Sequence, residues 1–261
     1  MAISATRNRA LFPSSFDPFG RPAFLRWHSK VHTMRVKRRQ LDSSGSSFTL
    51  GFEEDKAVRL IGMLDSPYVR RVAISLRIQD IAFSHESLSV FSDFDAFASI
   101  NPVVKSPSFV TDDGTVLMDS SLILEFAERL GGLSSSLVPK DLREHARAQR
   151  IIGLALAACE KTVQIVYEHN FRPSEKRHGP WLDRVQGQLL SAYGLLEKEV
   201  LRADPWLFAD RLLQADITSA VAFRFTCEML PHILDRQTYP ALSGLSRRAE
   251  ESEAFRAYPF R

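Results

Sequence analysis

Residues 60–76 read LIGMLDSPYVRRVAISL, a short apolar segment followed by Ser-Pro and then by a mixed apolar and basic run. Serine is a favoured helix N-cap, and proline is favoured at the first helical position. Apolar residues then recur every three or four positions, at Val69, Val72, Ala73 and Leu76. This stretch predicts a strand at 58–62 that leads, through Ser66, directly into a helix.

The residues that follow predict a small mixed α/β domain at 57–133. Further strands are expected at 81–88, 108–110 and 115–118, and Asp112-Asp113-Gly114 is a hairpin signal between the last two. Asp119-Ser120-Ser121 predicts the cap of a helix at 122–130, which Gly131-Gly132 ends. The element order is strand, helix, strand, irregular stretch, hairpin, helix, which indicates a four-stranded mixed sheet.

An all-helical domain is predicted at 141–258, after a Gly- and Ser-rich link. Helices are expected at 143–169, 181–201, 216–230 and 242–255. In the second of these, one apolar face steps by three or four residues through Leu182, Val185, Leu189, Tyr193, Leu196 and Val200. The third is preceded by Leu213-Gln214-Ala215-Asp216, where a hydroxyl residue in place of Leu213 would complete a capping box with Asp216.

The first 56 residues predict a flexible basic extension. Residues 1–40 hold nine Lys and Arg against one acid, and 43–47 read SSGSS. An Arg-rich, acid-poor start is typical of an organelle transit peptide at 1–40, although a disordered tail or a later start at Met34 fits as well. We expect a cytoplasmic protein, with the organelle as the alternative.

Charge and cysteine usage exclude several classes of protein. The 221 residues after position 40 hold 25 Lys and Arg against 30 acids, which argues against a nucleic-acid partner. The apolar run at 151–159 is too short to cross a bilayer, so no membrane partner is expected. Cys159 and Cys227 lack metal-ligand spacing and fit buried thiols in a reducing compartment.

Three short segments of the first domain carry candidate chemistry: Ser66 after the first strand, Lys105-Ser106-Pro107 before the third, and Asp119-Ser120 at the last helix. Each segment alone is ordinary. In a sheet of this order, however, all three would converge at one edge.

There a serine hydroxyl at a helix N-terminus could donate to a substrate thiolate. A cis Ser106–Pro107 bond would leave the Ser106 backbone free to pair with an extended peptide. Asp119 and Ser120 suit an α-amino group and an α-carboxylate respectively.

Together these segments resemble a known family. LIGMLDSPYVRRVAISL (60–76) is similar to the first strand and helix of serine-type glutathione S-transferases, NPVVKSPSFV (101–110) to their cis-proline segment, and LMDSSLILEFAERL (117–130) to their Glu/Asp-Ser element. The resemblance covers about 58–258, and the three segments are most similar to those of tau-like and related bacterial enzymes. It implies a thioredoxin-like glutathione-binding domain followed by an all-helical substrate domain.

The resemblance also implies a role for each site residue. Ser66 would activate the thiol of glutathione, the co-substrate, and Lys105 would neutralise its glycyl carboxylate. Ser106 would pair with its cysteinyl backbone beside the cis-proline, Pro107. Asp119 and Ser120 would hold the γ-glutamyl end. No metal is implied.

The activity implied is detoxification by transfer of glutathione to a hydrophobic electrophile, in a homodimer. The alternatives are a glutathione-dependent peroxidase and a non-catalytic binding protein of the same fold. A zeta-type isomerase is disfavoured because its Ser-Ser-Cys cluster is absent, and an omega-type reductase because it needs cysteine at Ser66.

The second substrate is expected between Ser66 and the helical domain. Candidate wall residues, each also consistent with ordinary packing, are Tyr167, His169, Phe171 and Trp206. Arg70 and Arg71 are expected on a solvated face or in salt bridges across a dimer.

Overall fold

The computed structural model describes residues 58–132, 135–208 and 210–261, so the predicted extension at 1–56 lies outside the described residues. Four strands form one mixed sheet in the order β2-β1-β3-β4. β1 (Arg59–Ile61) is parallel to β2 (Ser84–Glu86) and antiparallel to β3 (Ser108–Val110). β4 (Val116–Met118) closes the sheet antiparallel to β3, as the hairpin signal predicts.

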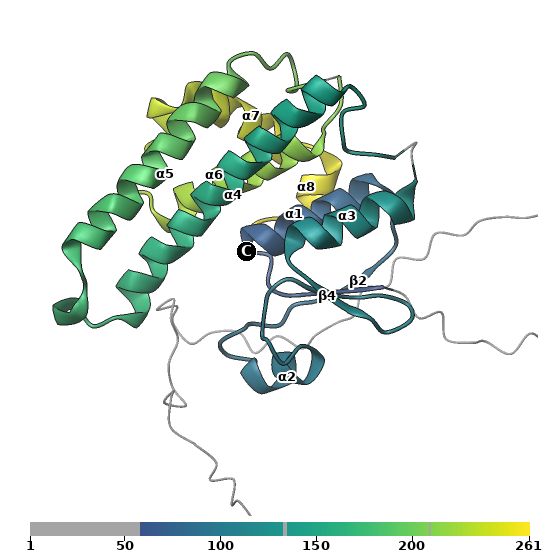
Figure 1. The fold of residues 1–261 in the computed structure, drawn as a ribbon, viewed down its shortest axis with the longest axis horizontal. Helices are drawn as coiled ribbons and strands as arrows, with labels where there is room; N and C mark the ends of the chain where they lie inside the picture. Colours follow the sequence, from purple (N-terminus) through teal and green to yellow (C-terminus); the bar gives the residue numbers. More distant parts are fainter. Residues whose placement is uncertain (1–57, 133–134, 209) are drawn as a thin grey trace, which may run out of the picture.

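Helices cover both faces of the sheet. α1 (Pro67–Ile78) and α3 (Ser120–Gly131) lie on one face, and α2 (Phe94–Ile100) lies on the other (Figure 1). Because successive side chains of a strand point to opposite faces, Leu60 joins the cluster under α1 and α3 while Ile61 packs with α2. The result is a thioredoxin-like domain.

α2 corrects one expectation, because the sequence predicts an irregular stretch for its residues. The helix has only seven residues, and Phe97 is the single buried member. A helix this short shows barely two turns of apolar periodicity, which is too little to be distinguished from a loop.

The rest of the chain is helical. The elements are α4 (Leu142–Phe171), a 3₁₀ turn (Ser174–Lys176), α5 (Gly179–Val200), α6 (Gln214–Met229), a second 3₁₀ turn (Arg236–Thr238), α7 (Pro240–Glu250) and α8 (Glu253–Ala257). The single helix expected at 242–255 is therefore two helices, interrupted at Glu251 and Ser252. Within the described residues, no helix is both long enough and apolar enough to cross a membrane.

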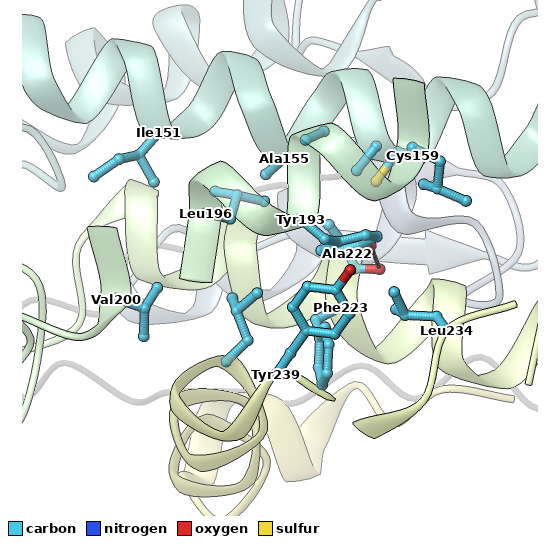
Figure 2. Close-up of a cluster of buried hydrophobic side chains, with 14 of the residues drawn as sticks. Ile151, Ala155, Cys159, Tyr193, Leu196, Val200, Ala222, Phe223, Leu234 and Tyr239 are labelled. Atoms are coloured by element: carbon cyan, nitrogen blue, oxygen red, sulfur yellow. Dashed lines mark hydrogen bonds between the residues drawn. The ribbon is translucent and has the colours of Figure 1, made fainter. Parts of the chain in front are cut away.

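The core of the helical domain forms where α4, α5 and α6 meet (Figure 2). The Tyr193 hydroxyl lies 2.9 Å from the Ala222 carbonyl oxygen and 2.6 Å from Thr226 Oγ1, which in turn lies 2.7 Å from Thr162 Oγ1. Cys159 lies in the same core, where burial raises the pKa of its thiol to about 12. It is therefore an inert buried thiol, as expected.

α6 begins with half of a capping box. The Asp216 carboxylate accepts hydrogen bonds from the Leu213 amide (3.1 Å) and from the Leu207 amide (2.9 Å). Leu213 has no side-chain acceptor to supply the other half. The bond from Leu207 is not visible in the local sequence pattern, and it adds a second buried donor to the one expected.

α1 joins the two domains and corrects the expectation for its arginines. Arg70 is 1% exposed and pairs within the chain: its Nη1 and Nη2 each lie 2.7 Å from one Glu250 carboxylate oxygen. Its Nε donates to the Tyr258 carbonyl at 2.8 Å. Arg71 is 2% exposed. Neither arginine lies on a solvated face, because α7 and α8 cover Arg70 and the start of α3 lies against Arg71.

Candidate functional site

The register of the sheet brings the three candidate segments to one edge. Ile61 pairs with Ser108, and Ser108 pairs with Met118, so these residues form one line across β1, β3 and β4. At this line the chain leaves β1 toward Ser66, enters β3 from the Lys105-Ser106-Pro107 segment, and leaves β4 into Asp119. The predicted convergence follows from this pairing.

Ser66 is the N-cap of α1, but its hydroxyl does not cap the helix. The backbone is extended there (φ −69°, ψ 121°), and the side chain makes no capping hydrogen bond to the described α1. The backbone is well held, because the Ser66 carbonyl accepts from the Arg70 amide at 3.0 Å. The hydroxyl thus remains available at the positive end of a helix, and the side chain is only partly buried.

The bend before β3 is held by a hydrogen-bond network. The Ser106–Pro107 bond is cis, as the sequence predicts. Asn101 is 4% exposed, and its Nδ2 donates to Ser108 Oγ at 2.8 Å, while Ser108 Oγ donates to the Lys105 carbonyl at 2.8 Å. Lys105 itself is exposed, which leaves its ammonium group free to meet a carboxylate.

Gly62 allows this bend to touch the end of β1. A Cβ at Gly62 would lie 2.3 Å from Ser106 Oγ and 2.6 Å from Val69 Cγ2, and the φ of Gly62 is +137°. Only glycine tolerates both the contact and the backbone angle. The Ser106 segment therefore lies directly against the turn that leads to Ser66.

Asp119 and Ser120 begin α3 with an unusual backbone. The φ of Asp119 is +69°, a left-handed value that is uncommon for a residue with a side chain and is often found at ligand sites. The Asp119 carboxylate accepts from the Ser121 amide at 2.9 Å but stays exposed. Ser120 is 3% exposed, and its Oγ accepts from Arg71 Nη1 at 3.4 Å.

Two of the four candidate wall residues contact the first domain. The rings of Tyr167 and Phe171 on α4 contact Phe91 of the first domain, with ring centroids 5.8 and 4.9 Å from that of Phe91. Burial raises the pKa of Tyr167, and the charge of Asp65, the residue before Ser66, raises it further. These aromatic rings form an apolar surface between the domains.

The other two candidates lie elsewhere. The Arg248 guanidinium carbon lies 5.7 Å from the Trp206 ring centroid, in the packing that involves α7. His169 lines a cavity of about 320 Å³ together with Val166, Asn170, Arg177, Met229, Leu230 and His232. Trp206 is therefore a packing residue, which is the alternative expected for each of these four positions.

Sequence reasoning missed two residues that shape the site. Asn101 anchors the bend through its buried amide, and Arg71 reaches Ser120 from α1. The Asn101-Pro102 dipeptide before the bend is a turn signal that could have indicated Asn101. Arg71 gave no signal, because only its burial distinguishes it from a surface arginine. The described residues contain no group of three or more His, Cys, Asp or Glu placed to hold a metal ion.

The geometry defines the class of protein. A thioredoxin-like domain with a four-stranded mixed sheet, followed by an all-helical domain, is the fold of glutathione transferase structures. Residues 60–135 match the sequence model described as the N-terminal domain of glutathione S-transferases.

Individual relatives agree with this. The crystal structure of a glutathione S-transferase from Methylobacterium radiotolerans, in complex with glutathione sulfonate, is 26% identical with a TM-score of 0.72, and the match covers 78% of this chain and 96% of that one. The uncharacterized GST-like protein YibF of Escherichia coli is 28% identical over 63% of this chain and 80% of its own length.

A plant relative matches a shorter region. Glutathione S-transferase U4 of Arabidopsis thaliana is 26% identical over 37% of this chain, and the match spans 42% of the plant protein, less than half its length. The family model, YibF and the solved structure therefore agree that the chain is similar to glutathione transferases, and the match to the family model covers its N-terminal domain.

Proposed function

We propose that this protein is a serine-type glutathione transferase, which activates the thiol of glutathione for attack on an electrophilic small molecule. The observation that carries the proposal is the line Ile61–Ser108–Met118, because it gathers the three candidate segments at one edge of the sheet. The structurally similar enzyme of Methylobacterium radiotolerans was solved with a glutathione derivative, which supports a glutathione site here.

In this proposal the chemistry of Ser66 is donation of a hydrogen bond to a sulfur anion. A free thiol with a pKa of about 8.5 is only a few per cent ionised at neutral pH. Lowering that pKa by two units requires about 2.7 kcal/mol of preferential thiolate stabilisation. One charge-assisted hydrogen bond and the N-terminus of α1 together supply an amount of this order. The uncapped state of the Ser66 hydroxyl supports this role.

The remaining residues would position the tripeptide. The exposed Lys105 would meet the glycyl carboxylate, and the backbone of Ser106 would pair with the cysteinyl residue as a neighbouring strand does. Asp119 and Ser120 would bind the γ-glutamyl end. The electrophile would then lie against Tyr167 and Phe171, whose rings contact Phe91 of the first domain.

Replacement of Ser66 by alanine tests the assignment. The S66A variant should lose roughly tenfold to a hundredfold in turnover of a chloronitrobenzene with glutathione, because one hydrogen bond to the thiolate is removed. The Kd for glutathione should change by less than about twofold, since the other contacts remain. The thiol pKa of bound glutathione, followed by the ultraviolet absorbance of the thiolate, should rise.

A matched control is S99A on α2, whose hydroxyl bonds the Ala96 carbonyl on the opposite face of the sheet. It should leave turnover and the thiol pKa unchanged. Unchanged turnover in S66A would show that Ser66 is the wrong residue. Binding of glutathione without turnover of any electrophile or hydroperoxide would instead favour a binding protein, and turnover of hydroperoxides alone would favour a peroxidase.

A further inference from the structure

Arg71 is a buried cation with few partners of its own. It is 2% exposed, yet its Nη1 makes one long hydrogen bond of 3.4 Å to Ser120 Oγ. Its Nε is buried and has no hydrogen-bond partner among the described residues. Buried donors are nearly always paired, so an unpaired one at a candidate site needs an explanation.

The surroundings of Arg71 do not neutralise it fully. Burial lowers the pKa of Arg71 to about 10, so the guanidinium stays charged at neutral pH. Among the described titratable side chains that act on it, Asp119 is the only carboxylate. Burial raises the pKa values of Cys159 and Tyr68 and keeps both neutral, so neither offsets the positive charge of Arg71. The guanidinium also lies beside the positive end of α3, through its bond to Ser120.

This excess of positive charge indicates which kind of ligand the site would bind. An anion placed at Ser120 would meet the Ser120 hydroxyl, the positive end of α3 and the field of Arg71. A cationic group placed next to it would meet the exposed Asp119 carboxylate. A ligand that carries an ammonium and a carboxylate on one carbon atom satisfies both requirements.

The bond between Arg71 and Ser120 also fixes the direction of the serine proton. Because Ser120 Oγ accepts from Arg71 Nη1, its own proton is left to point away from α1. The hydroxyl is then set to donate to a carboxylate above the start of α3. Arg71 therefore acts on a ligand both through its charge and through the orientation of Ser120.

We infer that Arg71 is a positioning residue that determines specificity for the α-carboxylate of the γ-glutamyl group, acting through Ser120 from beneath the start of α3. This inference rests on the proposed glutathione site. It adds Arg71 of α1 to the residues that the resemblance implies. It also means that the Arg71 guanidinium selects for the γ-glutamyl end of the ligand without contacting it directly.

The test compares two ligands that differ by one group. Glutathione and γ-aminobutyryl-cysteinyl-glycine are identical except that the second lacks the α-carboxylate. The wild type should bind glutathione more tightly by about tenfold or more. The R71M variant should lose about tenfold in affinity for glutathione by isothermal titration calorimetry, and its affinity for the analogue should stay within about twofold of the wild type. R71K, which keeps the charge, should recover part of the loss.

Three controls make the outcomes distinct. R129M removes an exposed arginine from the far end of α3 and should affect neither ligand. If R71M does not fold, R71Q serves for the same comparison, because it keeps a donor and removes the charge. An equal loss for both ligands, or no loss for either, would overturn the inference. Failure of the wild type to bind glutathione at all would overturn the proposed function and this inference with it.

Discussion

Two adjacent arginines on α1 have opposite environments. Arg70 points to the helical domain, where its guanidinium meets both oxygens of Glu250, the Tyr258 carbonyl and the ring of Phe255. Arg71 points to the start of α3 and keeps an unpaired Nε. The two are equally buried, so burial alone does not separate a structural charge from a binding one. The number of hydrogen-bond partners that the protein supplies does separate them.

The largest effect that tests this comparison is expected at Arg70. R70M should lower the free energy of unfolding by about 3–5 kcal/mol, because it leaves the Glu250 carboxylate without its cation at a packed junction. R71M should lower it by less than about 1 kcal/mol, since few protein contacts are lost. Urea unfolding followed by circular dichroism measures both. Equal losses would show that Arg71 is structural after all.

A smaller effect is expected from the partner of Arg70. E250Q keeps one oxygen acceptor and removes the charge, so a loss of about 1–2 kcal/mol in the free energy of unfolding is expected. The matched control is E125Q, which alters an exposed pair with Arg129 and should change stability by less than about 0.5 kcal/mol. If both variants lose the same amount, the bidentate geometry of the Arg70 pair contributes nothing special.

The smallest effect concerns Asp216, a buried anion satisfied by two backbone amides. Burial raises its pKa to about 6 from an ordinary 3.8, against the opposing effect of the Leu207 and Leu213 amides. The folded state therefore binds the proton more tightly than the unfolded state. This contribution to stability is fully present below about pH 4 and is lost as the pH rises through about 6.

The wild type should accordingly gain about 1 kcal/mol of unfolding free energy relative to D216N when the pH falls from about 7 to about 5. Urea unfolding of both proteins at the two pH values measures this difference. If the difference in unfolding free energy does not change with pH, the two amides keep the Asp216 carboxylate ionised at both pH values. Asp216 would then have as complete a set of partners as Arg70 has.

Local patterns predicted most of the fold. The Ser-Pro start of α1, the hairpin at Asp113 and the buried face of α5 depend on neighbours a few residues away, and the structure confirms each. The break between α7 and α8 and the short α2 were missed, because each depends on where a brief segment packs and not on its own periodicity.

The site was predictable only in part. The shared sheet edge follows from element order, the cis bond before Pro107 follows from the Ser-Pro dipeptide and the family resemblance, and both are present. The environments of Arg70 and Arg71 do not follow from it. Glu250 lies 180 residues from Arg70 in sequence, and Ser120 lies 49 residues from Arg71. No pattern within α1 indicates such partners.

The hydrogen bonds of Arg70 to Glu250 and Tyr258 can form only late in the synthesis of the chain. Glu250 and Tyr258 are translated 180 and 188 residues after Arg70. Until they leave the ribosome, the helix that Ser66 begins has an unpaired guanidinium and a bare outer side, the kind of incompletely covered surface on which chaperones act. That surface of the nascent thioredoxin-like domain therefore stays uncovered until the helices that follow it have been made.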